Sequence, residues 1–342
     1  MLVADDSSIV RDILERVLSR IDDIQVVGMA TNGKEAVALT KDLEPDVVLM
    51  DVRMPVMDGI EATASLMEDR PTPVLILSSA INEDANVAFE AIQAGAIDVV
   101  AKPTGMLSAD YAGNELDLVR RIRLVSTVPA IRRRKKTREQ AEPAPASKVV
   151  VGRSRAIAIG ASTGGPPALA SVINGFPAGF DVPVLAVQHI STGFLQGFVE
   201  WLDSTVPLSV RVAEQGERLE AGVVYFAPED WHLGLSEEAR ITLTRKPQVE
   251  GHRPSVDVLF ESVAEALGPR SVGVLLTGMG RDGADGLQAM KTAGATTLCQ
   301  DEESSVVFGM PAAAIELGAA SKVLPLEDIS SAIVEALGRS DS

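Results

Sequence analysis

The strongest constraint on the fold is a regular alternation of short apolar runs with amphipathic stretches, repeated along most of the chain. In residues 1–123 five apolar runs read as strands: MLVADD, IQVVGMA, DVVLMD, PVLILSS and AIDVVAKP. Stretches with apolar residues at helical spacing lie between them. Strands that alternate with helices form parallel sheets with right-handed crossovers. The pattern therefore predicts an α/β domain.

The same alternation returns after Arg153. Further strand-like runs extend from RAIAIGA and VPVLAVQHI to SVGVLLTG and TTLCQD, with helical stretches such as SVDVLFESVAEAL between several of them. Residues 223–246 read as a hairpin and are expected to add antiparallel strands. The prediction for residues 153–342 is a second α/β domain, doubly wound around a mostly parallel sheet.

A change of composition separates the two regions. The segment RRRKKTREQAEPAPASK is first basic and then rich in Ala, Pro and Glu, with no apolar periodicity. Such a segment is typical of a solvated linker, and an anionic partner for its basic run is the alternative. A chain of 342 residues is long enough for two cores. We expect a first domain over 1–123, a flexible linker over 124–152 and a second domain over 153–342.

Composition narrows the class of protein. Hydrophobic residues make up 46% and charged residues 23%, which is typical of a soluble globular protein. No apolar run approaches the length of a membrane span, and the N-terminus does not resemble a signal peptide. The single cysteine, Cys299, excludes an internal disulfide and fits a cytoplasmic location. A formal net charge of -17 argues against nucleic acid as a partner.

Polar side chains stand where the predicted strands of the first domain end. They are Asp5 and Asp6, Asp51, Ser78 with Ser79, and Lys102. The carboxyl ends of parallel strands share one edge of a sheet, so these groups are expected to meet there. Clustered carboxylates attract a hard cation such as Mg²⁺, and a carboxylate beside Mg²⁺ and an ammonium group is well placed to attack a phosphoryl group. The alternative, unrelated capping residues, does not explain three carboxylates, a hydroxyl and an ammonium group at corresponding strand ends.

The segments ADDS, DVRMPVMDG, LSS and AKP, at this spacing, resemble the response-regulator receiver family. The resemblance implies a flavodoxin-like (βα)5 fold and a histidine kinase as phosphodonor. It also implies roles for these polar groups. Asp51 would be the phosphoacceptor, and Ser78 and Lys102 would be the switch residues. The Mg²⁺ ligands would be Asp5, Asp6, Asp51 and the Arg53 backbone carbonyl. The chain departs from the family in two ways. Its first strand is short, and Val99 stands where many receivers have an aromatic switch residue.

The second domain contains a glycine-rich turn, GASTGG, directly after its first predicted strand. Its glycines do not have the G-x-G-x-x-G spacing of a dinucleotide site, and no lysine is present for a phosphate-binding P-loop. Gly160-x-Ser162-x-Gly164 does match a nucleophile elbow, in which small residues let the chain turn and expose a serine. A helix N-cap is the plain structural alternative.

A serine nucleophile needs a base, which is usually a histidine oriented by a carboxylate. His189 ends a predicted strand and is expected at the same sheet edge as Ser162. Asp282 follows the apolar run SVGVLLTG, and Asp285 is its nearby rival. The order Ser, His, Asp differs from that of α/β-hydrolases. The turn around Met279 has the glycines needed to aim a backbone N–H at an oxyanion.

The segments IGASTGGPPAL, VQHI, HRPSVDVLF and LTGMGRDGADG resemble the CheB-type methylesterase family. With the receiver in front, the resemblance covers nearly the whole chain. It implies a bacterial chemotaxis enzyme that hydrolyses glutamate methyl esters on the cytoplasmic helices of chemoreceptors and also deamidates their glutamines. Ser162 would be the nucleophile, His189 the base and Asp282 its orienting carboxylate, with the Met279 N–H in the oxyanion hole. Hydrolysis would need no cofactor.

The family also implies that the unphosphorylated receiver blocks the active site, and that phosphorylation of Asp51 relieves the block. Contact with the membrane would occur only through the receptors. Two interpretations of the HRPSVD segment remain open. In one, His252 and Arg253 lie near the Ser162 site and bind substrate; in the other, Pro254 and Ser255 simply begin a helix. His232 is expected to be structural or at the surface. A binding module without catalysis, a DNA-binding regulator and an esterase of small metabolites are the competing functions.

Overall fold

The computed structural model describes residues 1–78, 82–103, 111–128 and 155–339 of the chain. These residues form two compact units, one built mainly on the sequence before the expected linker and one on the sequence after it; the short stretch Ser191–Phe198 groups with the first unit. The expected linker lies almost entirely outside the described residues, and so does Ser79.

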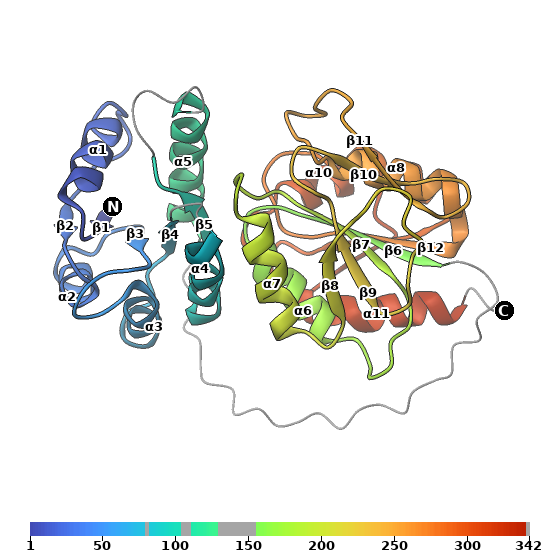
Figure 1. Ribbon diagram of the computed structural model, residues 1–342, viewed down its shortest axis with the longest axis horizontal. Helices are drawn as coiled ribbons and strands as arrows, with labels where there is room; N and C mark the ends of the chain where they lie inside the picture. Colours follow the sequence, from blue (N-terminus) through green and yellow to red (C-terminus); the bar gives the residue numbers. More distant parts are fainter. Residues whose placement is uncertain (79–81, 104–110, 129–154, 340–342) are drawn as a thin grey trace. The chain divides into compact units, whose positions relative to one another are not determined.

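The N-terminal unit is a five-stranded parallel sheet with helices between its strands (Figure 1). The strand order is β2-β1-β3-β4-β5, as in flavodoxin-like folds. The strands are β1 (Leu2–Ala4), β2 (Gly28–Ala30), β3 (Val48–Asp51), β4 (Val74–Ser78) and β5 (Asp98–Ala101). The helices are α1 (Ser8–Leu18), α2 (Gly33–Leu43), α3 (Gly59–Asp69), α4 (Asn82–Ala94) and α5 (Tyr111–Ser126). Helix α5 continues past residue 123, the expected end of this domain.

Local chemistry explains where helices α1, α2 and α3 begin. Ser7, Asn32 and Asp58 each precede a helix in extended conformation, and each side chain accepts a hydrogen bond from a backbone N–H of the first turn. These residue types are the favoured N-caps. One face of the sheet is buried under α1 and α5, through residues that include Leu14, Leu18 and Ile122.

The C-terminal unit is a seven-stranded sheet, all parallel, with the order β14-β13-β12-β6-β7-β9-β8. Figure 1 labels β6 to β9 and β12 of this sheet. Its strands are β6 (Ala156–Ala161), β7 (Val184–Gln188), β8 (Ser209–Val212), β9 (Val223–Phe226), β12 (Ser271–Leu275), β13 (Thr296–Gln300) and β14 (Lys322–Leu324). The helices are α6 (Gly165–Asn174), α7 (Leu195–Thr205), α8 (Val256–Leu267), α9 (Ala284–Thr292), α10 (Met310–Glu316) and α11 (Leu326–Arg339), with a short 3-10 turn, η1 (Gly268–Arg270).

The antiparallel hairpin is separate from this sheet and smaller than the sequence suggested. It consists of β10 (His232–Leu235) and β11 (Ile241–Thr244), which pair with each other alone among the described strands. Strand β9, which also falls within 223–246, pairs in parallel with β7 and β8. The expected α/β class with two domains and a hairpin is confirmed; only the extent of the hairpin needed correction.

The order of the large sheet creates a place for a ligand. From β6 the chain first builds the side that contains β7, β9 and β8, and it then returns to add β12, β13 and β14 on the other side. Such a reversal opens a crevice at the carboxyl ends of the two central strands. Ser162 follows β6 at this point. Within the described parts of the chain, no helix is long and apolar enough to cross a bilayer.

Candidate functional sites

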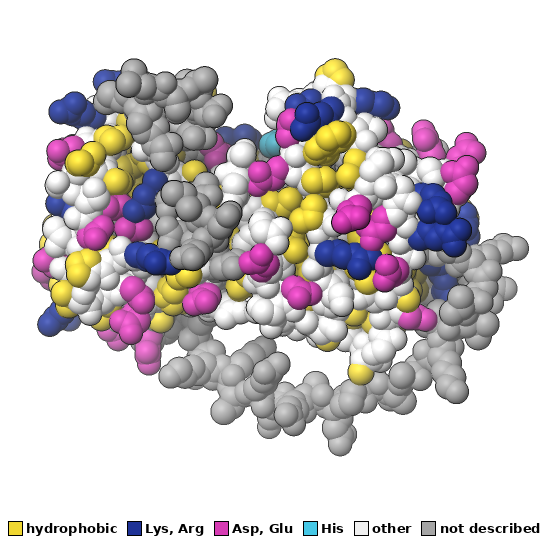
Figure 2. Space-filling view, in the orientation of Figure 1, with side chains coloured by type: hydrophobic (Ala, Val, Ile, Leu, Met, Phe, Trp, Pro, Cys, Tyr) yellow, Lys and Arg dark blue, Asp and Glu magenta, His cyan; other side chains and the backbone are white. Residues whose placement is uncertain are grey.

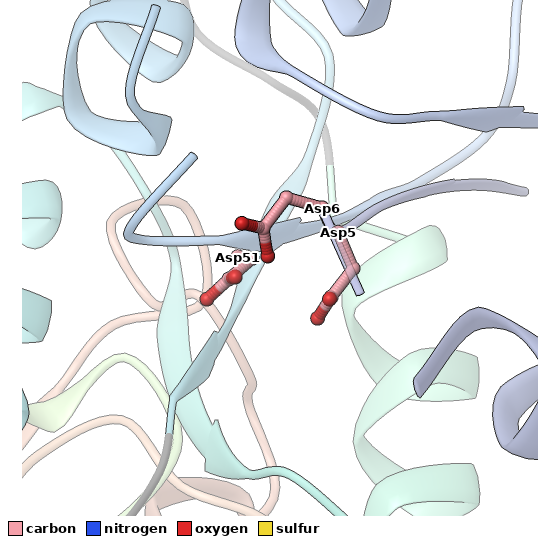
Figure 3. A group of neighbouring side chains, drawn as sticks. All are labelled: Asp5, Asp6 and Asp51. Carbon is pink, nitrogen blue, oxygen red and sulfur yellow. The ribbon is translucent and has the colours of Figure 1, made fainter. Parts of the chain in front are cut away.

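The three expected carboxylates of the N-terminal unit lie together. Asp5 and Asp6 follow β1, and Asp51 ends β3, which is hydrogen-bonded to β1. One oxygen from each carboxylate lies within 4.8 Å of the others (Figure 3). Asp5 and Asp51 are buried, whereas Asp6 is exposed. Three carboxylates at this separation repel one another unless a cation lies between them.

Lys102 supplies part of the compensating charge. Its Nζ lies 2.9 Å from Asp5 Oδ2 and 2.8 Å from Asp51 Oδ2. Burial raises the pKa of Asp51 to about 6, although Lys102 acts against the rise, while Asp5 and Asp6 add to it. One ammonium therefore does not neutralise the cluster. Oxygen ligands with excess negative charge fit Mg²⁺.

The structure also places Ser78 at the same edge. Ser78 ends β4, is buried, and its carbonyl accepts a hydrogen bond of 2.8 Å from the Lys102 backbone N–H. Gly59 is a residue that the sequence analysis did not single out. A Cβ at this position would lie 2.0 Å from the Asp51 carbonyl oxygen, so only glycine lets α3 begin this close to Asp51. Arg53 stands in the loop between β3 and α3, and the role of its carbonyl stays a prediction.

In the C-terminal unit, Ser162 stands in the turn between β6 and α6. Its backbone N–H donates to the Thr277 carbonyl at 3.0 Å, and its side chain is buried. Gly164, with φ of 76°, takes the left-handed conformation that lets the turn lead directly into α6. The strand, the sharp turn and the helix are the context that a nucleophile elbow requires.

His189 lies beside Ser162 because their strands are neighbours. It directly follows β7, and its backbone N–H donates to the Ala161 carbonyl at 3.0 Å. The Gln188 side chain ties the two positions together: its Nε2 donates to the Ser162 carbonyl at 2.8 Å and to the His189 carbonyl at 2.9 Å. Gln188 was missed in the sequence, although a polar residue at the end of the apolar run VLAV was a visible signal.

Asp282 is the carboxylate that meets His189. His189 Nε2 and Asp282 Oδ2 are 2.9 Å apart. Asp285, the rival, lies in the first turn of α9, is half-exposed, and pairs with Arg281 at 3.1 Å. Among the described residues, His189 Nδ1 is buried and has no hydrogen-bond partner. The imidazole thus has one nitrogen bound to a carboxylate and the other left for a further proton exchange.

Asp282 is held at the N-terminus of α8. Its carboxylate accepts hydrogen bonds from the Ser255 hydroxyl at 2.7 Å, from the Val256 N–H at 2.8 Å and from the Asp257 N–H at 3.1 Å. Burial opposes ionisation of Asp282, but the His189 bond and these N–H groups outweigh it and lower the pKa of Asp282 to about 2. The group is therefore a fixed negative charge beside His189 at neutral pH.

The loop after β12 packs against Ser162. A Cβ on Gly278 would lie 2.8 Å from the Ser162 Cβ, so the backbone of this loop passes directly beside the serine. The Gly278 N–H donates to the Val307 carbonyl, and the Gly278 carbonyl accepts from the N–H groups of Gly309 and Met310. Met279, the expected oxyanion donor, is the next residue of this loop. The segment around Val307, which the sequence analysis did not include, therefore supports the loop.

The HRPSVD segment divides its residues between two roles. His252 stacks on His189, with ring centroids 3.8 Å apart and planes 5° apart. Arg253 instead binds the Asp230 carboxylate through Nε at 2.8 Å and through Nη2. Ser255 is the N-cap of α8, as the plain helix-start interpretation expected, and it also binds Asp282.

His232 is structural, and the surface alternative is wrong. It is 1% exposed, its Nδ1 accepts a hydrogen bond from the Ser255 N–H at 3.2 Å, and its Nε2 lies 3.1 Å from the Pro247 carbonyl oxygen. In this arrangement Nδ1 of His232 is the hydrogen-bond acceptor and Nε2 is the donor, as in one tautomer of imidazole. His232 thereby supports the residue that holds Asp282.

Two known protein families match this chain. The response regulator receiver domain family matches residues 1–108, and the CheB methylesterase family matches residues 157–333. A protein-glutamate methylesterase/protein-glutamine glutaminase of Nitrosospira multiformis is 42% identical over 341 residues, which cover 97% of this chain and 95% of that protein. Protein-glutamate methylesterase/protein-glutamine glutaminase 1 of Syntrophus aciditrophicus is 41% identical over 345 residues, covering 99% and 98%.

A solved structure supports the fold of the second unit. The crystal structure of the Thermotoga maritima CheB methylesterase catalytic domain is 39% identical, with a TM-score of 0.52, and the match covers 54% of this chain and 99% of that one. The resemblances inferred from the motifs are confirmed. The chain belongs to the CheB family of protein-glutamate methylesterases/protein-glutamine glutaminases, in which a response regulator receiver domain precedes the methylesterase domain.

Proposed function

We propose that the C-terminal unit hydrolyses γ-glutamyl methyl esters of chemoreceptors by a Ser162-His189-Asp282 triad, and that it also deamidates receptor glutamines. The observation that carries this proposal is the buried His189–Asp282 hydrogen bond at the strand end next to Ser162. The relatives' names supply the substrate class. Chemoreceptors are expected to present the substrate in the cytoplasm.

The proposed reaction uses the two nitrogens of His189 differently. Ser162 Oγ attacks the ester carbonyl carbon while its proton passes to His189 Nδ1, and the Asp282 carboxylate stabilises the imidazolium through Nε2. The tetrahedral intermediate collapses, the C–O bond to methoxide breaks, and Nδ1–H protonates the methoxide to methanol. Water then attacks the acyl-enzyme, with His189 again taking the proton, and leaves the glutamate carboxylate. With a glutamine substrate, ammonia leaves instead of methanol.

The negative charge that develops on the carbonyl oxygen needs donors at a fixed position. We assign this role to the Met279 N–H because the neighbouring Gly278 backbone lies against Ser162. The residues present contain every group that this mechanism needs, so no cofactor takes part in the proposed hydrolysis.

We further propose that the N-terminal unit controls this activity. A histidine kinase would transfer a phosphoryl group to Asp51, with Mg²⁺ held by Asp5, Asp6, Asp51 and the Arg53 carbonyl. Mg²⁺ would neutralise the transferring oxygens. Lys102, which already contacts Asp51, and the Ser78 hydroxyl at the end of β4 would then bind the phosphoryl oxygens. The support is the acidic cluster and the family match.

Methanol release from a methylated chemoreceptor tests the esterase proposal. Ser162→Ala is expected to reduce the rate by about 10⁴-fold or more, because alanine has no hydroxyl with which to attack the ester carbonyl. Ser171→Ala is the matched control, since Ser171 is an exposed serine on α6, the helix that follows Ser162. It should keep the parent rate. Unchanged hydrolysis by Ser162→Ala would refute the proposal, and equal hydrolysis of small free esters without receptor specificity would favour an esterase of metabolites.

A further inference from the structure

The ring of His252 lies flat against the ring of His189. The centroids are 3.8 Å apart and the planes differ by 5°, so the two imidazoles overlap face to face. His189 is almost fully buried and His252 is half-buried. All three histidines of the chain belong to the C-terminal unit, and Figure 2 shows that a histidine side chain reaches the surface near Lys and Arg side chains. His252 thus keeps part of its surface in contact with solvent, whereas His189 keeps little.

The bond to Asp282 does not by itself fix the orientation of the His189 ring. It restrains one ring atom, Nε2, while rotation about the Cβ–Cγ bond of histidine has a broad energy profile. A tilt of the ring about that bond moves Nδ1. Nδ1 has no hydrogen-bond partner among the described residues, so no such bond from them opposes the tilt. A flat group in contact with the ring face opposes it directly.

His252 is itself firmly held. Its backbone N–H donates to the Val249 carbonyl at 2.8 Å, and its carbonyl accepts from the Val249 N–H at 3.1 Å. The next residue, Arg253, anchors the segment to Asp230 and donates to the Lys246 carbonyl at 3.0 Å. Ser255 then binds Asp282. One short segment therefore restrains both groups that surround His189: the ring on its face and the carboxylate at its edge.

Direct proton transfer between the two histidines does not fit this geometry. The N–H bonds and nitrogen lone pairs of imidazole lie in the ring plane, and the two planes are nearly parallel. A proton on His252 consequently does not point at a nitrogen of His189. The contact acts through shape and packing.

We propose that His252 is a positioning residue, whose stacked ring holds the plane of His189 in the orientation that lets Nδ1 accept the proton of Ser162. The inference rests on the proposed function, because it takes His189 as the base for Ser162. It predicts that a flat ring at position 252 is needed, and that the nitrogen atoms of that ring are not.

Two substitutions separate the flat ring from its nitrogens. His252→Phe keeps a ring without nitrogens, and His252→Gln keeps polar atoms without a ring. Each variant is made in the full chain, and its folding is checked by circular dichroism. Two rates are measured: methanol release from methylated chemoreceptor, and sulfonylation of the enzyme by phenylmethanesulfonyl fluoride. Sulfonylation reports how reactive Ser162 is without the receptor. His252→Leu, apolar and without a ring, replaces the Gln variant if that variant fails to fold.

The Phe variant is expected to keep kcat and the sulfonylation rate within about threefold of the parent. The Gln variant should lose about 10- to 100-fold in both rates with little change in KM, because a displaced base slows the chemical step and leaves receptor binding unchanged. A Phe variant as slow as the Gln variant, or a Gln variant as fast as the parent, would overturn the inference. Ser162→Ala separates the two proposals: if it alone is inactive, the triad stands and the role of His252 does not.

Discussion

At the scale of single residues, one carboxylate decides how His189 behaves. Asp282 is buried and receives four hydrogen bonds, from the His189 ring, the Ser255 hydroxyl and two backbone N–H groups. A carboxylate that accepts so many bonds stays ionised and does not move. Asp285, three positions further along, is half-exposed and contacts Arg281. The two aspartates therefore offer a matched pair for mutation.

Asp282→Asn is expected to lower kcat for methanol release by about 10³- to 10⁴-fold, because the neutral amide cannot stabilise the His189 imidazolium. Asp285→Asn should leave kcat within about twofold of the parent, since it removes only an exposed ion pair. The rates are compared at saturating receptor. Equal losses in both variants would show that the His189–Asp282 contact has no special role.

The acidic cluster of the N-terminal unit makes a second prediction at this scale. Isothermal titration with MgCl₂ should show binding to the parent chain and about tenfold weaker binding to Asp6→Asn, which lacks one of the three clustered carboxylates. Asp12→Asn, which removes an exposed acid on α1, is the control and should bind as the parent does. If Asp6→Asn bound Mg²⁺ as tightly as Asp12→Asn does, Asp6 would not be a ligand.

At the scale of elements, the N-terminus of α8 organises the C-terminal site. It binds Asp282 through two N–H groups and a capping serine, and it carries a second buried acid, Asp257. Burial raises the pKa of Asp257 to about 7; the Gly286 N–H, which binds it, opposes the rise, and the charge of Asp282 adds to it. Two neighbouring acids thus have pKa values shifted in opposite directions.

The stability of the C-terminal unit should consequently depend on Asp257. Its folded pKa lies above the ordinary value of 3.8, so its contribution to stability is complete below about pH 4 and is lost as the pH rises to about 7. The Asp257→Asn variant has no carboxyl to ionise at this position, so it does not lose this stability as the pH rises. Its amide oxygen can still accept a hydrogen bond from the Gly286 N–H. Between pH 4 and pH 8 the variant should gain about 1 to 2 kcal/mol relative to the parent, after allowance for solvent screening.

Urea unfolding followed by tryptophan fluorescence measures this difference, because both tryptophans, Trp201 and Trp231, belong to the C-terminal unit. A difference between variant and parent that stays constant from pH 4 to pH 8 would contradict the assignment of the shifted pKa to Asp257.

Elements were predictable from the sequence where local chemistry determines them. Helix α2 begins after its cap, Asn32, and extends over the amphipathic stretch that the spacing indicated. Strand β2 is shorter than the run IQVVGMA, because its partner β1 has only the residues Leu2–Ala4 to pair with. The length of a strand depends on the partner strand with which it pairs. That partner lies elsewhere in the chain, so a local sequence pattern does not show where the pairing ends.

The same reason limits how much of the site could be predicted. Ser162, His189 and Asp282 each follow a strand, and parallel topology brings strand ends together, so their meeting was foreseeable. The stacking of His252 was not, because it depends on a loop closed by contacts with Val249 and Asp230. The hydrogen bond from Gln188 to the Ser162 carbonyl could not be foreseen either, because it depends on the turn that follows a different strand, β6.

At the scale of the whole molecule, the chain joins two α/β units with different chemistry. One gathers carboxylates and an ammonium group at the ends of β1, β3 and β5, a set suited to Mg²⁺ and a phosphoryl group. The other gathers a serine, a histidine and an aspartate at the ends of β6, β7 and β12, a set suited to acyl transfer. The proposed regulation requires that a change at Asp51 alters the rate at Ser162.

Methanol release from methylated chemoreceptor, measured with and without acetyl phosphate and Mg²⁺, tests this coupling and the chemistry together. The parent chain should be stimulated about fivefold or more, as is typical of a coupling between two sites. Asp51→Asn should keep its basal rate without stimulation, and Ser162→Ala should be slowed about 10⁴-fold or more under either condition. Methanol release by Ser162→Ala at the parent rate would contradict the proposed hydrolysis, and a parent rate that acetyl phosphate leaves unchanged would contradict control by the N-terminal unit.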